Sequence, residues 1–235
     1  DRTNKEFSKQ LDLCIRKRIP SGCTVNQKET MKDVDGVIAD VSKRTNQDLS
    51  YVLKSYSSLG GGNHFIEAGR MEDNNICLTI HSGSRNFGLK IALHYQKIAQ
   101  AKNPSLGKEL AWLEGDDATS YLNDMRVAQK FASQNRHGML WNMMDELSII
   151  DFQSTIESVH NFIGDDNIIR KGAISAKKDE MVIIPWNMRD GLIIGKGKGN
   201  EDWNNSAPHG AGRVLSRSKA KEKVTLDEYK KSMEG

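Results

Sequence analysis

Long hydrophobic runs and paired cysteines are both absent from this sequence of 235 residues. Its apolar stretches, such as Met181–Pro185 and Leu192–Ile194, fall far short of the roughly 18–20 residues that cross a bilayer, and the N-terminus carries no hydrophobic signal region. The three cysteines (Cys14, Cys23 and Cys77) are odd in number and widely spaced, which argues against a secreted disulfide framework. We therefore expect a cytoplasmic protein with no membrane-spanning segment.

A strong excess of charge of either sign is also missing. Lysine and arginine number 34 against 31 acidic residues, and the net charge of +3 permits nucleic acid as a partner without arguing for it. The hydrophobic share of 37% over this length suffices for the core of one large domain or two small ones. The sequence begins at Asp1 and not at methionine, which indicates a processed, trimmed or partial chain.

Familiar nucleotide-binding and hydrolytic motifs are missing as well. No Gly-x-x-x-x-Gly-Lys-Ser/Thr loop and no Gly-x-Ser-x-Gly elbow occurs, and Gly195-Lys-Gly-Lys-Gly matches neither a P-loop nor a dinucleotide fingerprint. No two cysteines stand close enough in the sequence for a zinc ribbon. These absences disfavour the common P-loop, Rossmann, serine-hydrolase and zinc-ribbon classes.

Hydrophobic periodicity predicts helices and short strands interspersed along the chain. Helical spacing occurs before Pro20, within 34–53 (a helix followed by a loop), in 88–102, in 119–147 with Gly138 as a candidate interruption, and in the tail from Thr225. Alternation predicts strands after the glycine loop 59–63 and in 76–80, 182–185 and 192–194. Because the order has no clean βαβ rhythm, we predict a mixed α/β or α+β domain.

The six histidines divide into two groups by their surroundings. Four of them stand in loop or strand-end segments rich in glycine, serine and asparagine: His64, His81, His160 and His209. Ligand-binding groups concentrate in such loops, and imidazole is the commonest transition-metal ligand. The alternative for each one is an ordinary histidine bonded to backbone, and this is the interpretation we favour for His94 and His137, which fall on helical patterns.

The segment Trp203–Lys221 is basic and contains no acidic residue. If Arg213 and Arg217 lie on one helix, their spacing of four directs both to the same side. A glycine loop that leads into a basic helix start suits phosphate, because backbone N–H groups attract anions and guanidinium groups bind phosphate oxygens. The alternative is a solvated basic helix face, and the residues alone leave both open.

Several other side chains near these loops also have two interpretations. Glu67 either recognises a base edge or pairs with an arginine, and Trp186 and Trp203 either stack on a base or fill part of a core. The sequence Arg170-Lys-Gly adds positive charge near the proposed site, whereas Cys77 alternates with apolar strand residues and is interpreted as structural.

Taken together, six motifs resemble those of one family. They follow the family's order along the chain: Leu59-Gly-Gly-Gly-Asn-His-Phe-Ile-Glu, His81-Ser-Gly-Ser-Arg, His160-Asn, Arg170-Lys-Gly-Ala, Ile183-Ile-Pro and His209-Gly-Ala-Gly-Arg-Val-Leu-Ser-Arg. The sequence from about Ser55 to Lys221 thus resembles the RtcB family, the GTP- and manganese-dependent RNA-splicing ligases. The resemblance implies that family's fold of packed sheets flanked by helices, with 1–235 forming a single catalytic domain that is incomplete at both ends.

The chemistry implied by the resemblance is RNA ligation in splicing, tRNA processing or RNA repair. It joins an RNA end with a 2',3'-cyclic phosphate or 3'-phosphate to a 5'-hydroxyl end. The matching catalytic residue is His209, which attacks the α-phosphate of GTP and forms a guanylyl-histidine. The matching manganese ligands are His64, His81 and His160.

The resemblance also implies which residues hold the substrates. The nucleotide-binding positions are Asn63, His64, Phe65, Ile66, Glu67, His160, Asn161, Pro185, Trp186, Asn187, Met188, Leu192, His209, Gly210, Ala211 and Gly212. The positions that contact RNA or phosphate are Arg85, Arg213 and Arg217.

Some positions depart from the family pattern. Nothing matches the family's Asp-x-Gly-Cys-Gly-Met, whose Asp and Cys complete the metal sites, nor its terminal lysine. Pro185-Trp-Asn-Met stands for Pro-Gly-Ser-Met, Leu192 for a serine of the nucleotide cradle, and Pro208 for a cysteine. Two alternatives to a ligase therefore stay open: a nucleotide- or RNA-binding protein without catalysis, and a metal-dependent phosphoesterase.

Overall fold

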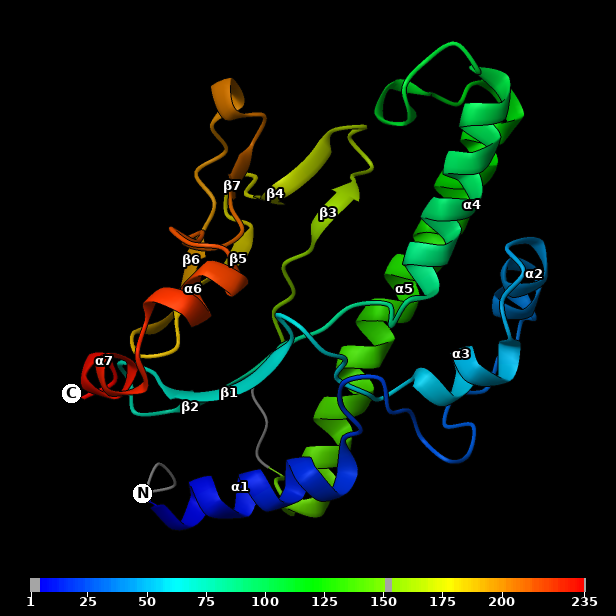
Figure 1. Ribbon diagram of the computed structural model, residues 1–235. Coiled ribbons are helices and arrows are strands. Elements are labelled where there is room, and N and C mark those ends of the chain that lie inside the picture. The colour runs from blue at the N-terminus through cyan, green and yellow to red at the C-terminus, as the bar shows by residue number, and fades with distance from the viewer. Residues whose placement is uncertain (1–4, 151–153, 235) are drawn as a thin grey trace. The chain divides into compact units, whose positions relative to one another are not determined.

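The computed structural model describes residues 5–150 and 154–234, and it leaves the side chain of Arg217 undescribed (Figure 1). These residues form helices and small antiparallel sheets, which confirms the predicted mixed α/β class. The chain divides into two compact units, one up to residue 152 and one from residue 153. Among the helices of the described residues, none combines the length and apolar character needed to span a membrane.

The first unit is mainly helical, with one β-hairpin. Its helices are α1 (Lys5–Arg18), α2 (Val37–Arg44), α3 (Leu49–Ser55), α4 (Phe87–Lys102), the short 3-10 turn Lys108–Leu110 and α5 (Gly115–Glu146). Its hairpin consists of β1 (Phe65–Arg70) and β2 (Ile76–His81), paired antiparallel. The long helices α4 and α5 run side by side (Figure 1).

The second unit is mainly β-structure. One sheet has the order β3-β4-β7 and contains His160–Ile163, Ile169–Ser175 and Ser206–Pro208. A separate hairpin joins β5 (Met181–Asn187) to β6 (Gly191–Lys196), as the sequence predicts, and a 3-10 turn covers Glu201–Trp203. The helices α6 (Arg217–Lys223) and α7 (Leu226–Ser232) follow β7, and Thr225 and Glu228 form a capping box at the start of α7.

Two apolar clusters stabilise the first unit, and α5 contributes to both. The first packs α2, α3 and α4 against α5 around Phe87 and Phe131, whose ring centroids lie 5.5 Å apart. The second packs α1 and one face of the β1–β2 hairpin against α5, around Met139 and Met143. Burial of such side chains is worth about 1.5–3 kcal/mol each. The hairpin is therefore fixed on α5 through its apolar face.

Two details of the predicted helices are wrong. The segment 34–53 contains two helices and not one, because Asp48 caps a second helix by accepting hydrogen bonds from the backbone N–H groups of Ser50 and Tyr51. Gly138 does not interrupt α5. A Cβ atom there would overlap Ser57 Oγ and lie 2.7 Å from the Tyr56 ring, so glycine lets the loop after α3 lie directly against the helix.

An ion pair between a buried aspartate and a partly exposed arginine also links the helices of the first unit. The carboxylate of Asp124, on α5, accepts hydrogen bonds from Arg44 Nη2 at 2.8 Å, from Arg44 Nε at 3.0 Å and from the Tyr95 hydroxyl at 2.9 Å. Burial, followed by the adjacent Asp124 carboxylate, raises the pKa of Tyr95 to about 12. The neutral phenol is thus part of the folded state.

We expect Tyr95 to make stability depend on alkaline pH. Its raised folded-state pKa contributes stability below the ordinary value of 10.0, and this contribution is lost as pH rises toward about 12. At pH 8 the wild-type chain should exceed Tyr95→Phe in free energy of unfolding by about 1–3 kcal/mol, and the difference should vanish by pH 12. Urea unfolding of both chains at several pH values checks this. A difference that stays constant over this range would contradict the assignment.

Candidate functional site

His64 and His81 lie together at one end of the β1–β2 hairpin. Phe65 is paired directly with His81, at the end of the ladder opposite the 71–75 turn. The His64 and His81 ring centroids are 6.0 Å apart, and the Phe65 ring lies 5.1 Å from His81. The hairpin thus brings two loop-flanked histidines together, as their shared sequence context suggests.

The ring separation of this histidine pair falls below the upper limit for two ligands of one metal ion. A nitrogen–metal bond of about 2.1 Å limits the centroids of two imidazoles on one ion to a separation of about 6.5 Å. The observed 6.0 Å satisfies this limit. Within the described residues, no group of three or more His, Cys, Asp or Glu side chains is arranged to hold a metal. Two of the three predicted metal ligands therefore meet in the first unit.

The loops that carry these histidines are held by Asn135, a residue that sequence reasoning missed. Its side chain is fully buried on α5, and its Oδ1 accepts a hydrogen bond from Ser58 N at 3.0 Å. Its Nδ2 donates to Ser58 O at 3.1 Å, Gly83 O at 3.0 Å and Ser82 Oγ at 3.3 Å. One amide thus links the segment before His64 to the segment after His81. An asparagine at a buried position of an amphipathic helix is the signal that points to it.

Arg85 ends the second histidine motif, and neutral groups hold its side chain. Its Nε donates to Ser58 Oγ and its Nη2 to Gly22 O, both at 2.8 Å. Burial lowers the pKa of this guanidinium. A surface hollow beside Arg85 is also lined by Tyr51 and Lys90. Arg85 is therefore oriented before any ligand is bound.

His160 and His209 form the corresponding pair in the second unit. His160 begins β3, His209 directly follows β7, and their ring centroids lie 4.7 Å apart. His209 contacts the Gly172 carbonyl oxygen twice, through Nδ1 at 2.8 Å and through its backbone N–H at 3.3 Å. Because a carbonyl oxygen only accepts hydrogen bonds, this contact places the proton of a neutral His209 on Nδ1. The lone pair is then on Nε2.

A bulge in β4 directs the Gly172 carbonyl toward His209. The β3–β4 register shifts between His160 and Phe162, and Gly172 has a φ of 69°, which favours glycine. Asn161, also at positive φ, accepts a hydrogen bond from Gly172 N through Oδ1 at 3.0 Å. Asn161 thus holds the Gly172 peptide, and the Gly172 carbonyl orients the His209 ring.

The glycine loop after His209 lies against β5. Ala211 N donates a hydrogen bond to the carbonyl of Pro185 at 3.2 Å, so two segments of the predicted nucleotide cradle meet. Pro185 is paired with Leu192 in the β5–β6 hairpin. Near the tip of that hairpin, Trp186 at the end of β5 and Met188 in the turn are exposed over 57% and 72% of their surface. Their side chains are accessible to a ligand.

Arg213 does not share a helix with Arg217, which was one of the two arrangements that the sequence leaves open. Helix α6 begins at Arg217, after Ser216, whose hydroxyl caps it, and Arg213 lies in the exposed loop before it. Arg213 is not helical because it directly follows the glycine-rich segment 210–212, in which Gly212 has a φ of 75°. The side chain of Arg217 lies outside the described residues.

The other predicted nucleotide-binding residues of the first unit surround His64. Asn63 is exposed, whereas Ile66 packs on the apolar cluster at Met139 and Met143. Glu67 is partly buried in β1, and this burial raises the pKa of its carboxyl. Ile66 thus supports the strand through its side chain, and Glu67 lies on the opposite face.

These features define a mixed α/β protein in which histidines are paired at strand ends beside glycine-rich loops. Imidazoles in such pairs suit metal and phosphate chemistry. The family model described as "RtcB: tRNA-splicing ligase RtcB" matches residues 2–235. The chain belongs to the RtcB family, which confirms the resemblance inferred from the motifs.

Individual relatives agree with this assignment. The chain is 33% identical to the RNA-splicing ligase RtcB of Escherichia coli K12, over 74% of this chain and 49% of that protein. It is 26% identical to the tRNA-splicing ligase RtcB of Nanoarchaeum equitans, over 95% of this chain and 58% of that protein. The chain thus spans about half the length of the curated relatives it matches.

Proposed function

We propose that this chain acts in GTP- and manganese-dependent RNA ligation, and that it joins a 3'-phosphate or 2',3'-cyclic phosphate end to a 5'-hydroxyl end. Membership of the RtcB family supports this proposal. The single observation that carries it is the hydrogen bond from His209 Nδ1 to Gly172 O. The same proposal assigns residues 1–235 to one catalytic domain. It places the reaction in the cytoplasm, in RNA splicing, tRNA processing or RNA repair.

In this proposal, His209 Nε2 is the nucleophile toward the α-phosphate of GTP. Its lone pair forms the N–P bond while the bond from the α-phosphorus to the bridging oxygen breaks, and pyrophosphate leaves. Gly172 O accepts the hydrogen bond from Nδ1–H, so the proton stays on Nδ1. The same carbonyl stabilises the positive charge that develops on the ring. The guanylyl group then passes to the RNA 3'-phosphate, and attack by the 5'-hydroxyl releases GMP.

His64, His81 and His160 are the proposed manganese ligands. The spacing of the first two within one unit supports this assignment. When bound, the metal neutralises phosphate charge and polarises the phosphorus center toward attack. The chain's own contribution is to hold these imidazoles in place, through the β1–β2 register for His81 and through the start of β3 for His160.

The substrate-holding residues in this proposal are those of the family match. Asn63–Glu67, Asn161, Pro185–Met188, Leu192 and Gly210–Gly212 would contact GTP, and Arg85, Arg213 and Arg217 would contact RNA or phosphate. The bond between Ala211 N and Pro185 O supports a shared role for those two segments. The exposure of Trp186 suits stacking on a base.

A ligation assay tests the proposed function. The chain is incubated with GTP, Mn²⁺, a labelled RNA with a 3'-phosphate and a second RNA with a 5'-hydroxyl. Joined RNA that depends on GTP is the expected product. Loss of the 3'-phosphate without joining would indicate a phosphoesterase instead, and RNA binding with neither reaction would indicate a binding protein.

We expect Arg213 to contribute to RNA binding through charge. Arg213→Ala should weaken the binding of single-stranded RNA and reduce the slope of log affinity against log salt by about 0.7, the amount expected for one lost phosphate contact. Arg16→Ala is the matched control, because Arg16 is an exposed arginine of α1 that pairs with Asp12. Fluorescence anisotropy at several salt concentrations measures both slopes. An unchanged slope in Arg213→Ala would show that this arginine is merely solvated.

A further inference from the structure

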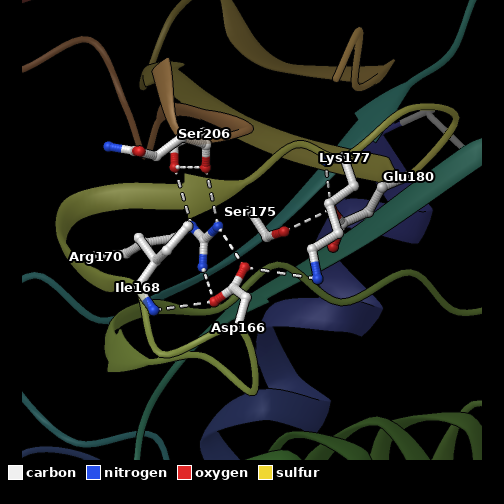
Figure 2. A network of polar contacts seen from close by, with 8 residues as sticks. Asp166, Ile168, Arg170, Ser175, Lys177, Glu180 and Ser206 are labelled. Atoms are coloured by element: carbon white, nitrogen blue, oxygen red, sulfur yellow. Dashed lines mark hydrogen bonds and ion pairs between the residues drawn. The ribbon is translucent and has the colours of Figure 1, made fainter. Parts of the chain in front are cut away.

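Arg170 is a buried arginine whose contacts extend over most of the β3-β4-β7 sheet. It lies on β4 with 2% of its surface exposed (Figure 2). Its Nε donates to Ser206 Oγ at 3.0 Å, and its Nη2 donates to Asn204 O at 3.1 Å. Its guanidinium also lies over the Phe162 ring of β3, 5.8 Å from the centroid. A single side chain therefore contacts β3 and the segment that enters β7.

The charge of Arg170 is compensated by Asp166, in the turn between β3 and β4. The two residues form a bidentate pair, with Nη1–Oδ1 at 3.1 Å and Nη2–Oδ2 at 2.9 Å (Figure 2). Asp166 Oδ1 also accepts a hydrogen bond from Ile168 N, and Lys177 Nζ lies 3.6 Å from Oδ2. The hydrogen bonds from Arg170 hold the pKa of Asp166 well below its usual range. The sequence suggests a free positive charge at Arg170, and the structure neutralises it.

This pair lies beside the bulge that orients His209. Arg170 is two residues before Gly172 on β4, and Ser206 is three residues before His209. Ala173, which follows Gly172, and Pro208, which precedes His209, form the last rung of the β4–β7 ladder. Gly172 and His209 are therefore next to this rung, and Arg170 contacts the chain on both strands: it lies on β4 before Gly172 and donates to Ser206 of β7. A bidentate arginine pair in a buried position is a rigid support for such a segment.

We propose that Asp166 and Arg170 are positioning residues that hold the β4 bulge in register, so that Gly172 O meets His209 Nδ1 and leaves Nε2 as the reactive nitrogen. This inference rests on the proposed role of His209 and adds the residues that select its tautomer. Neither residue touches the reacting atoms. Supporting groups of this kind typically change activity by about 10- to 100-fold.

The test separates positioning from simple stabilisation by measuring the tautomer of His209 in the folded chain. The chain is labelled with ¹⁵N-histidine, and two-bond nitrogen–proton NMR spectra report which ring nitrogen carries the proton. His209→Gln identifies the His209 signals. Wild type should show the proton on Nδ1. Asp166→Asn, which keeps the size of the side chain and removes its charge, should shift His209 toward the Nε2–H form that a free imidazole prefers.

The matched control is Lys177→Met. Lys177 contacts the same Asp166 carboxylate, its side chain is 56% exposed, and no hydrogen bond joins it to Arg170 in the described residues. This variant should keep the wild-type tautomer. It should also form the guanylyl adduct at the wild-type rate, whereas Asp166→Asn should be slower by about 10- to 100-fold.

If Asp166→Asn does not fold, Ser206→Ala carries the test, because it removes the acceptor of Arg170 Nε and keeps the Asp166 pair. A partial shift of the tautomer is then expected. A wild-type tautomer in folded Asp166→Asn or in Ser206→Ala would overturn the inference. A tautomer shift with no adduct in the wild-type chain would support the positioning role and overturn the proposed function instead.

Discussion

His209→Ala should abolish the covalent adduct that we expect between the chain and GTP labelled at the α-phosphate in the presence of Mn²⁺. The expected adduct is a phosphoramidate, which is labile in acid and stable in base. Loss of the nucleophile removes the covalent route altogether, since binding groups alone supply no atom to bond to phosphorus. Labelled protein, resolved by gel electrophoresis after acid or base treatment, measures this directly.

The controls are the two helical histidines. His94 lies on α4 with its ring 5.0 Å from that of Tyr95, and His137 Nδ1 contacts Ser133 O at 3.0 Å within α5. His94→Ala and His137→Ala should retain the adduct. An adduct that persists in His209→Ala would place the nucleophile elsewhere and refute this assignment.

Asn135→Ala should destabilise the first unit and loosen the two histidine loops together. The substitution leaves Ser58 N, Ser58 O and Gly83 O without their buried partner. Each unsatisfied group costs about 1–3 kcal/mol, so a loss of about 2–5 kcal/mol in free energy of unfolding is expected after partial relaxation. Urea unfolding followed by circular dichroism measures it.

Asn123→Ala is the matched control, because Asn123 is an exposed asparagine of the same helix. It should change stability by no more than about 0.5 kcal/mol. Binding of Mn²⁺ should weaken in Asn135→Ala and not in Asn123→Ala, under conditions where both are folded. Equal stability of the two variants would show that the Asn135 amide does not hold these loops.

The sequence predicts the local elements well where one physical signal dominates. Helical spacing of Phe7, Leu11 and Ile15 identifies α1, and the alternation of Ile76, Leu78 and Ile80 identifies β2. The prediction fails where a contact with a residue distant in the sequence determines the local conformation. Gly138 resembles a helix breaker in the sequence, yet in the structure it makes room for Tyr56 and Ser57.

The candidate site follows a similar division. The glycine-rich surroundings of the histidines point to His64, His81, His160 and His209, and the structure pairs them within each unit. The supports of these pairs could not be predicted, because Asn135 and Arg170 act through buried contacts with residues distant in the sequence. Periodicity reports the face on which a side chain lies, and not the partner that it finds there.

The proposed manganese ligands are His64, His81 and His160, and the Mn²⁺ affinity of alanine variants tests this proposal. Electron paramagnetic resonance of free Mn²⁺ gives the affinity of the wild-type chain and of each variant. Each of the three substitutions should weaken binding by more than about tenfold, because each removes one ligand, whereas His94→Ala should bind as the wild type does. Wild-type affinity in any of the three variants would show that the residue replaced there is not a manganese ligand.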